Sequence, residues 1–71
     1  MTIKGTVKYQ DLSGGFWGII GDQGKQWKPI KMPKALQKEG LNVQVEAEEA
    51  NSVISIFMWG TNISISDYKI L

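Results

Sequence analysis

Two residues with complementary chemistry, Phe16 and Lys28, lie on neighbouring segments of the sequence. A flat aromatic ring can stack on a nucleobase or a sugar ring, and an ammonium group attracts a charged backbone. Proteins that bind single strands use this combination, and each stacked base contributes about 1–3 kcal/mol. Phe16 and Lys28 are therefore candidates for a ligand-binding surface. The alternative is that Phe16 packs beneath the helix or the turn at residues 13–15 and has only a structural role.

Catalytic and metal-binding chemistry has little support in the composition. The sequence contains no Cys and no His, which removes thiolate nucleophiles, imidazole acid–base catalysis and the common zinc sites. Glu46 and Glu48 are carboxylates of the kind that glycosidases pair, but both belong to the solvent-facing side of one predicted strand. The Gly-containing stretches 14–15 and 21–24 lack the strand-to-helix context of a phosphate loop. We expect a protein that is not an enzyme and that holds no metal and no cofactor.

The charged residues argue for weak binding of polyanions at most. All eight basic residues are Lys and the formal net charge is +1, so no Arg fork is present to grip phosphate or guanine. Lysines gather between positions 25 and 38, which predicts either a basic strip or a solvated surface. Glu48 and Glu49, expected in the loop after the fourth strand, would repel phosphate. Any nucleic-acid binding should therefore be unselective, with Kd values of roughly 10⁻⁴–10⁻⁶ M.

The length limits the architecture. With 71 residues, the chain is expected to form one domain over residues 1–71, and it buries only about 60% of its unfolded surface. No apolar stretch approaches the roughly 20 residues of a membrane span, and the N-terminal residues lack the apolar segment of a signal peptide. The missing Cys fits a reducing compartment. We expect a cytoplasmic protein that does not enter a membrane.

Apolar and polar residues alternate with a period of two, which predicts strands. The clearest strand is 41–49, where Leu41, Val43, Val45 and Ala47 form the apolar side. The other predicted strands cover residues 2–12, 15–21, 25–30, 52–59 and 63–71. Within the last strand the apolar residues change from odd positions, Ile63 and Ile65, to even positions, Tyr68 and Ile70. This change predicts a bulge near Asp67.

A short helix is predicted over residues 33–39, between the third and fourth strands. Pro33 suits a first helical turn, and Gly40 suits the position after a helix end. The helix is too short to be stable alone. Leu36, with Ala35 as a second contact, is expected to anchor it to the sheet.

The strongest local prediction is a hairpin closed by Asp22-Gln23-Gly24, with Gly24 in the left-handed conformation. This loop places Ile19 opposite Trp27 and Trp17 opposite Pro29. Burying Gln26 and Lys28 without partners would cost several kcal/mol, so the opposite face should point inward, and its residues are Trp17, Ile19 and Trp27. The wetter face, together with the polar face of the first strand, then provides the candidate ligand-binding residues Phe16, Lys28, Gln26, Ile20 and Lys8. A second aromatic pair, Phe57 and Trp59, is expected to close a minor core or to contact a second subunit.

The order of three strands, a short helix and two or three strands resembles the OB-fold. The strings Gly5-Thr6-Val7-Lys8-Tyr9, Gly14-Gly15-Phe16-Trp17-Gly18-Ile19 and Met58-Trp59-Gly60 are also similar to a small group of uncharacterised prokaryotic OB-like domains. The resemblance implies an all-β fold, a small OB-like Greek-key barrel of five to six strands with one short helix between the third and fourth strands. It implies no particular activity, because one fold serves many functions.

Taken together, the residues predict a non-catalytic small binding module. Its expected ligand is single-stranded nucleic acid, bound weakly, or an oligosaccharide. The alternative is a protein-interaction or self-associating domain with no small ligand, which would use the surplus aromatic residues and a sheet edge.

Overall fold

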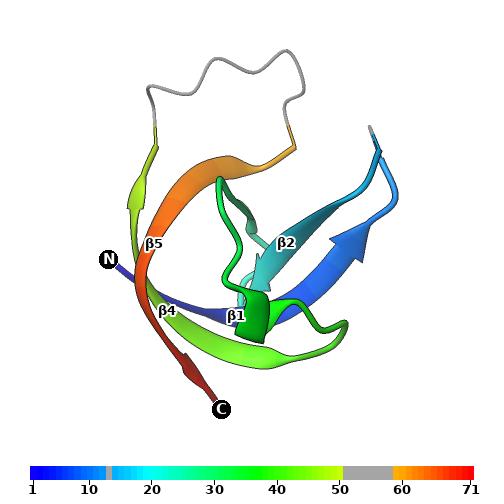
Figure 1. Ribbon diagram of the computed structural model, residues 1–71. Coiled ribbons are helices and arrows are strands. Elements are labelled where there is room, and N and C mark those ends of the chain that lie inside the picture. Colours follow the sequence, from blue (N-terminus) through cyan, green and yellow to red (C-terminus); the bar gives the residue numbers. More distant parts are fainter. Residues whose placement is uncertain (13, 51–58) are drawn as a thin grey trace.

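The computed structural model describes residues 1–12, 14–50 and 59–71. The described residues form five strands and one short helical turn: β1 (Thr2–Gln10), β2 (Phe16–Gly21), β3 (Gln26–Pro29), η1 (Lys34–Leu36), β4 (Asn42–Glu49) and β5 (Thr61–Ile70). The strands form a closed barrel in the order β1-β2-β3-β5-β4 (Figure 1). All neighbouring strands are antiparallel except β3 and β5, which are parallel. The all-β fold is thus confirmed, and the barrel fits a small OB-like architecture.

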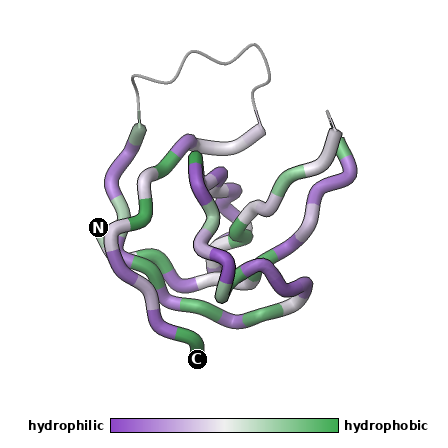
Figure 2. The backbone as a smooth tube through the Cα atoms, in the orientation of Figure 1, coloured by the Kyte–Doolittle hydropathy of each residue, from purple (hydrophilic) through white to green (hydrophobic). Residues whose placement is uncertain are grey.

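The core is built by the period-two alternation of the strands. Val43 and Val45 on β4 are completely buried, and Ile3 and Val7 on β1 lie against them. Apolar and polar positions alternate along much of the backbone in Figure 2. One side of each strand therefore faces the barrel interior, and the polar residues face solvent, as the alternation predicts.

Gly5 allows β1 and β2 to approach closely inside this core. A Cβ atom at Gly5 would lie 2.4 Å from the backbone oxygen of Ile20 and 2.9 Å from Cγ2 of Ile19. Neither contact can be relieved without moving the neighbouring strand. Gly5 thus belongs to the buried side of β1, as its place in the alternation predicts.

The β2–β3 hairpin has the predicted register at its closed end. Ile19 is paired with Trp27, Gly21 N–H donates to the carbonyl of Lys25, and Gly24 has φ +78°. The predicted pairing of Trp17 with Pro29 is wrong, because the β2–β3 ladder ends at Ile19–Trp27 and Pro29 pairs with Ile63 of β5. Proline has no N–H for a ladder, so the strands can separate there.

The predicted helix over residues 33–39 is wrong in its extent. Only Lys34–Leu36 is helical, and it is a 3-10 turn. Pro33 has ψ 139° and Gln37 has ψ 65°, so the backbone is non-helical on both sides of the turn. Leu36 is fully buried and anchors the turn, whereas Ala35 is exposed and does not.

The end of the chain contains the predicted bulge. The β4–β5 register shifts between Glu46, which faces Asp67, and Ala47, which faces Ile65, so Ser66 is the extra residue. The last strand starts earlier than the predicted residue 63, because Thr61 already belongs to β5. The strand predicted over residues 52–59 lies almost entirely outside the described residues.

Candidate ligand-binding face

The predicted site residues share one outer surface of the barrel. Ile20 is paired with Gln26 on β3 and with Thr6 on β1, so these three side chains lie on the same side of the sheet. Gly18 is paired with Lys8 on β1. Trp27 points into the core, so its neighbours Gln26 and Lys28 point outward. The structure therefore brings five sequence-predicted residues to one surface, which we call the outer β2–β3 face: Phe16, Ile20, Gln26, Lys28 and Lys8.

Phe16 lies at the centre of the contacts on this face. The ammonium nitrogen of Lys28 lies 5.0 Å from the centroid of the Phe16 ring, within the range of a cation–π contact. The ring of Trp59 meets Phe16 edge to face, with centroids 5.1 Å apart and an interplanar angle of 66°. Phe16 and Lys28 are both half-buried. The contacts hold the two predicted partners together in a small aromatic and cationic cluster.

Trp59 is the residue of this cluster that the sequence did not assign to the face. A Cβ atom on Gly18 would lie 2.4 Å from the outer edge of the Trp59 ring, so the ring occupies the space left by the missing side chain. A glycine inside a strand signals such a close approach, and Gly18 was the available clue. The other member of the predicted aromatic pair, Phe57, lies outside the described residues.

We expect Gly18→Ala to displace the Trp59 ring while the barrel stays folded, because the added methyl group meets the edge of an aromatic ring and no backbone atom among its nearest contacts. Nuclear Overhauser contacts between the rings of Phe16 and Trp59 should disappear in this variant. Gly21→Ala is the matched control on the same strand. The nearest atom to its added methyl group would be the ring nitrogen of Trp27 at 3.1 Å, and no atom of Trp59 is among its three nearest contacts. Persistence of the Phe16–Trp59 contacts in Gly18→Ala would contradict this placement of Trp59.

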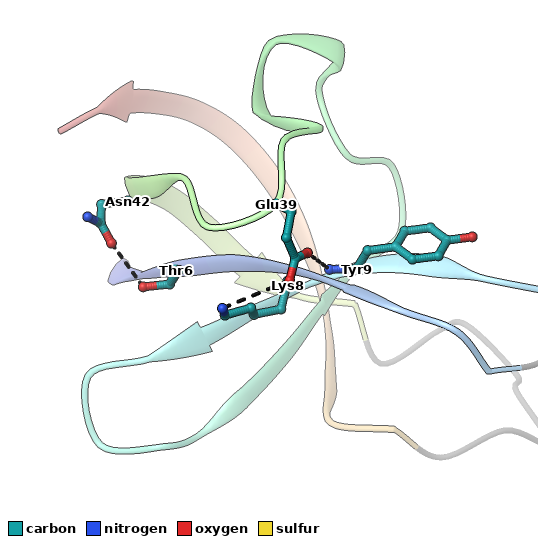
Figure 3. Close-up of polar contacts among 5 residues, drawn as sticks. All are labelled: Thr6, Lys8, Tyr9, Glu39 and Asn42. Carbon is teal, nitrogen blue, oxygen red and sulfur yellow. Dashed lines mark hydrogen bonds and ion pairs between the residues drawn. The ribbon is translucent and has the colours of Figure 1, made fainter.

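Lys8 has an acidic partner at the border of the face. Its ammonium nitrogen lies 3.9 Å from Oε1 of Glu39, and Oε2 of the same carboxylate accepts a hydrogen bond from the backbone N–H of Tyr9 (Figure 3). Both charged side chains are about half exposed, so the ion pair contributes little stability. Glu39 nevertheless offsets part of the positive charge that Lys8 brings to the face.

Three further acidic residues, Glu46, Glu48 and Glu49, lie on β4. Glu46 and Glu48 are exposed, as expected for the polar side of a strand, and Glu46 accepts a hydrogen bond from the hydroxyl of Thr2. The strand predicted to end at residue 49 does end there. The placement of Glu48 and Glu49 in the loop after it is wrong, because both residues still pair with β5, opposite Ser64 and Ile63.

Two kinds of feature are absent from the described part of the chain. It contains no group of three or more His, Cys, Asp or Glu side chains placed to hold a metal ion. Within the same residues, no helix is long and apolar enough to cross a membrane.

Comparison of the chain with protein-family models, curated proteins and solved structures finds no match.

Proposed function

We propose that this protein is a non-catalytic binding module of OB type, working in the cytoplasm of a prokaryote, that binds single-stranded nucleic acid weakly through the outer β2–β3 face. The observation that carries the proposal is the contact of Lys28 with Phe16 beside Trp59. Aromatic rings provide stacking surfaces for bases, and the lysine provides the attraction for phosphate. In OB-folds this face of strands 2 and 3 is also where oligonucleotides and oligosaccharides bind.

The charges of the face set the expected strength. Lys28 and Lys8 are the cations on it, and Lys8 already pairs with Glu39. With no Arg in the chain, phosphate contacts are limited to lysine point charges. We therefore expect Kd values in the non-specific range, roughly 10⁻⁴–10⁻⁶ M, that rise with salt.

An oligosaccharide is the second candidate ligand. A sugar ring can also lie on an aromatic side chain, and Gln26, exposed on the same face, offers an amide donor and acceptor to hydroxyl groups. Binding to a neutral sugar would depend little on salt, whereas binding to a polyanion weakens steeply with salt. Salt dependence therefore separates the two ligands.

An oligonucleotide titration at low salt, followed by chemical shifts, tests the proposal. We expect shifts at Phe16, Lys28 and Trp59.

Phe16→Ala should weaken binding by about 1–3 kcal/mol with the fold intact. Lys28→Ala should weaken binding equally for all sequences and reduce the salt slope by about one.

The controls change the same residue types elsewhere. Tyr68→Ala removes an exposed aromatic residue on β5, and Lys34→Ala removes an exposed cation on η1; neither should alter the affinity. If neither an oligonucleotide nor an oligosaccharide at millimolar concentration changes the chemical shifts, neither ligand binds to this face.

A further inference from the structure

The second half of β5 forms an open edge of the barrel. β3 pairs with β5 only over Thr61–Ile63, whereas β4 pairs with β5 as far as Ile70. A pocket of about 410 Å³ lies where the chain after β3 leaves β5, and it is lined by Ile30, Lys31, Pro33, Ser64 and Ile65. Beyond this pocket, no other described strand pairs with the free side of β5, and residues 66–71 are exposed. This part of β5 is the red end of the ribbon in Figure 1.

The backbone groups on the open side can be identified from the ladder. Leu71 N–H donates to the carbonyl of Asn42 on β4 at 3.0 Å, and hydrogen-bonded positions alternate along an antiparallel strand. The N–H and C=O groups of Tyr68 and Ile70 therefore point away from β4. In agreement, Tyr68 N–H donates to the carboxylate of its neighbour Asp67 at 2.9 Å. The edge thus offers backbone donors and acceptors to another strand.

The side chains beside Tyr68 make this edge complementary to itself. Asp67 and Lys69 flank Tyr68 with opposite charges, and neither forms an ion pair within the described residues. On its paired side, Asp67 lies opposite another acid, Glu46 of β4. Like charges directly opposite each other on neighbouring strands are unfavourable. A lysine arriving from the open side would relieve this repulsion.

We propose that two copies of this chain associate by antiparallel pairing of their β5 edges, with Tyr68 of one copy opposite Tyr68 of the other. A two-fold axis at this position places Asp67 of each copy opposite Lys69 of the second copy. The outward N–H and C=O groups of the two Tyr68 residues then bond to each other, and their side chains, 41% exposed, pack across the axis. An axis shifted to Lys69 would instead bring two lysines together.

The association is weak and depends on concentration. The free edge is only a few residues long, so it buries much less than the roughly 1,200–2,000 Å² of a stable interface. In the single copy, Asp67 already accepts the Tyr68 N–H and shields the edge. On pairing, this carboxylate turns to Lys69 of the second copy, and the N–H bonds to the facing carbonyl.

Sedimentation and amide chemical shifts over a series of protein concentrations, without ligand, test the proposal. We expect the sedimentation coefficient to rise toward that of a dimer, with shifts centred on Asp67–Ile70. A monomer at all concentrations up to millimolar would overturn the proposal, as would shifts centred on the outer β2–β3 face. Because no ligand is present, the result is independent of the proposed function.

Charge exchange tests the register. Asp67→Lys and Lys69→Asp should each raise the Kd of the dimer by about tenfold, because each places like charges across the axis. The double variant restores opposite charges and should return the Kd close to that of the parent. Lys38→Asp, the same charge change at an exposed residue away from β5, should have little effect. A double variant as weak as the single variants would overturn the register.

A proline substitution tests the backbone pairing itself. Tyr68→Pro removes an N–H that points to the open side and leaves the β4–β5 hydrogen bonds in place, a position where edge strands tolerate proline. We expect this variant to stay monomeric with a melting temperature near that of Tyr68→Ala. Dimerisation of a folded Tyr68→Pro variant would overturn pairing through this edge.

Discussion

Trp27→Ala is expected to lose about 3–5 kcal/mol of unfolding free energy, out of about 5–15 kcal/mol for a typical domain. The Trp27 side chain is only 9% exposed and belongs to the core cluster. It also stands where β3 pairs with both neighbours, opposite Ile19 on β2 and Thr61 on β5. Because β3 has only four residues, removing its one large core side chain should loosen the link between β2 and β5.

Urea denaturation followed by circular dichroism measures this loss. Trp27→Phe keeps an aromatic ring in the core and should retain most of the stability. Gln26→Ala changes the exposed neighbour and should alter the unfolding free energy by no more than about 0.5 kcal/mol. If Trp27→Ala unfolds at the same urea concentration as Gln26→Ala, Trp27 does not fill the core.

Leu36→Ala is expected to cost about 2–5 kcal/mol. Leu36 is fully buried in the core, whereas its helical neighbours Lys34 and Ala35 are exposed. The turn is too short to be stable by its own hydrogen bonds, so the Leu36 side chain is what attaches it to the barrel. Its removal leaves a cavity in the core and releases the segment between β3 and β4.

Thermal melting of Leu36→Ala, with Lys34→Ala as the matched surface change, tests this role. We expect a lower melting temperature only for Leu36→Ala. Hydrogen exchange should also become faster at Gly40, whose N–H donates to the carbonyl of Val7 on β1 just after the turn. Equal melting temperatures of the two variants would show that the turn does not depend on Leu36.

The sequence by itself determined the five strands that the structure describes and most of their inward faces. Strand formation and facing depend on the alternation of neighbouring residues, and this pattern is local. Val43 and Val45 were therefore assigned to the core correctly, and Gly24 set the correct register of Ile19 with Trp27. Tyr9 shows the limit of the pattern. It follows Ile3 and Val7 on the apolar side of the alternation in β1, yet its side chain is 46% exposed.

The candidate ligand-binding face was predicted in part. The outward direction of Phe16 and Lys28 followed from the hairpin register, which is local. The approach of Trp59 to Gly18 joins segments that are distant in the chain, so no periodicity could reveal it. The extent of the helix also differs from the prediction, because the backbone at Pro33 and Gln37 is non-helical on both sides of the turn.

Only the tertiary structure decided how the barrel closes and where it stays open. The parallel pairing of β3 with β5 covers Thr61–Ile63, and it leaves the second half of β5 with β4 as its one described partner. The alternation around Tyr68 shows a strand, but it does not show which side of that strand is paired. Closure depends on contacts between residues far apart in the chain, and these contacts determine which edge remains open to a second copy.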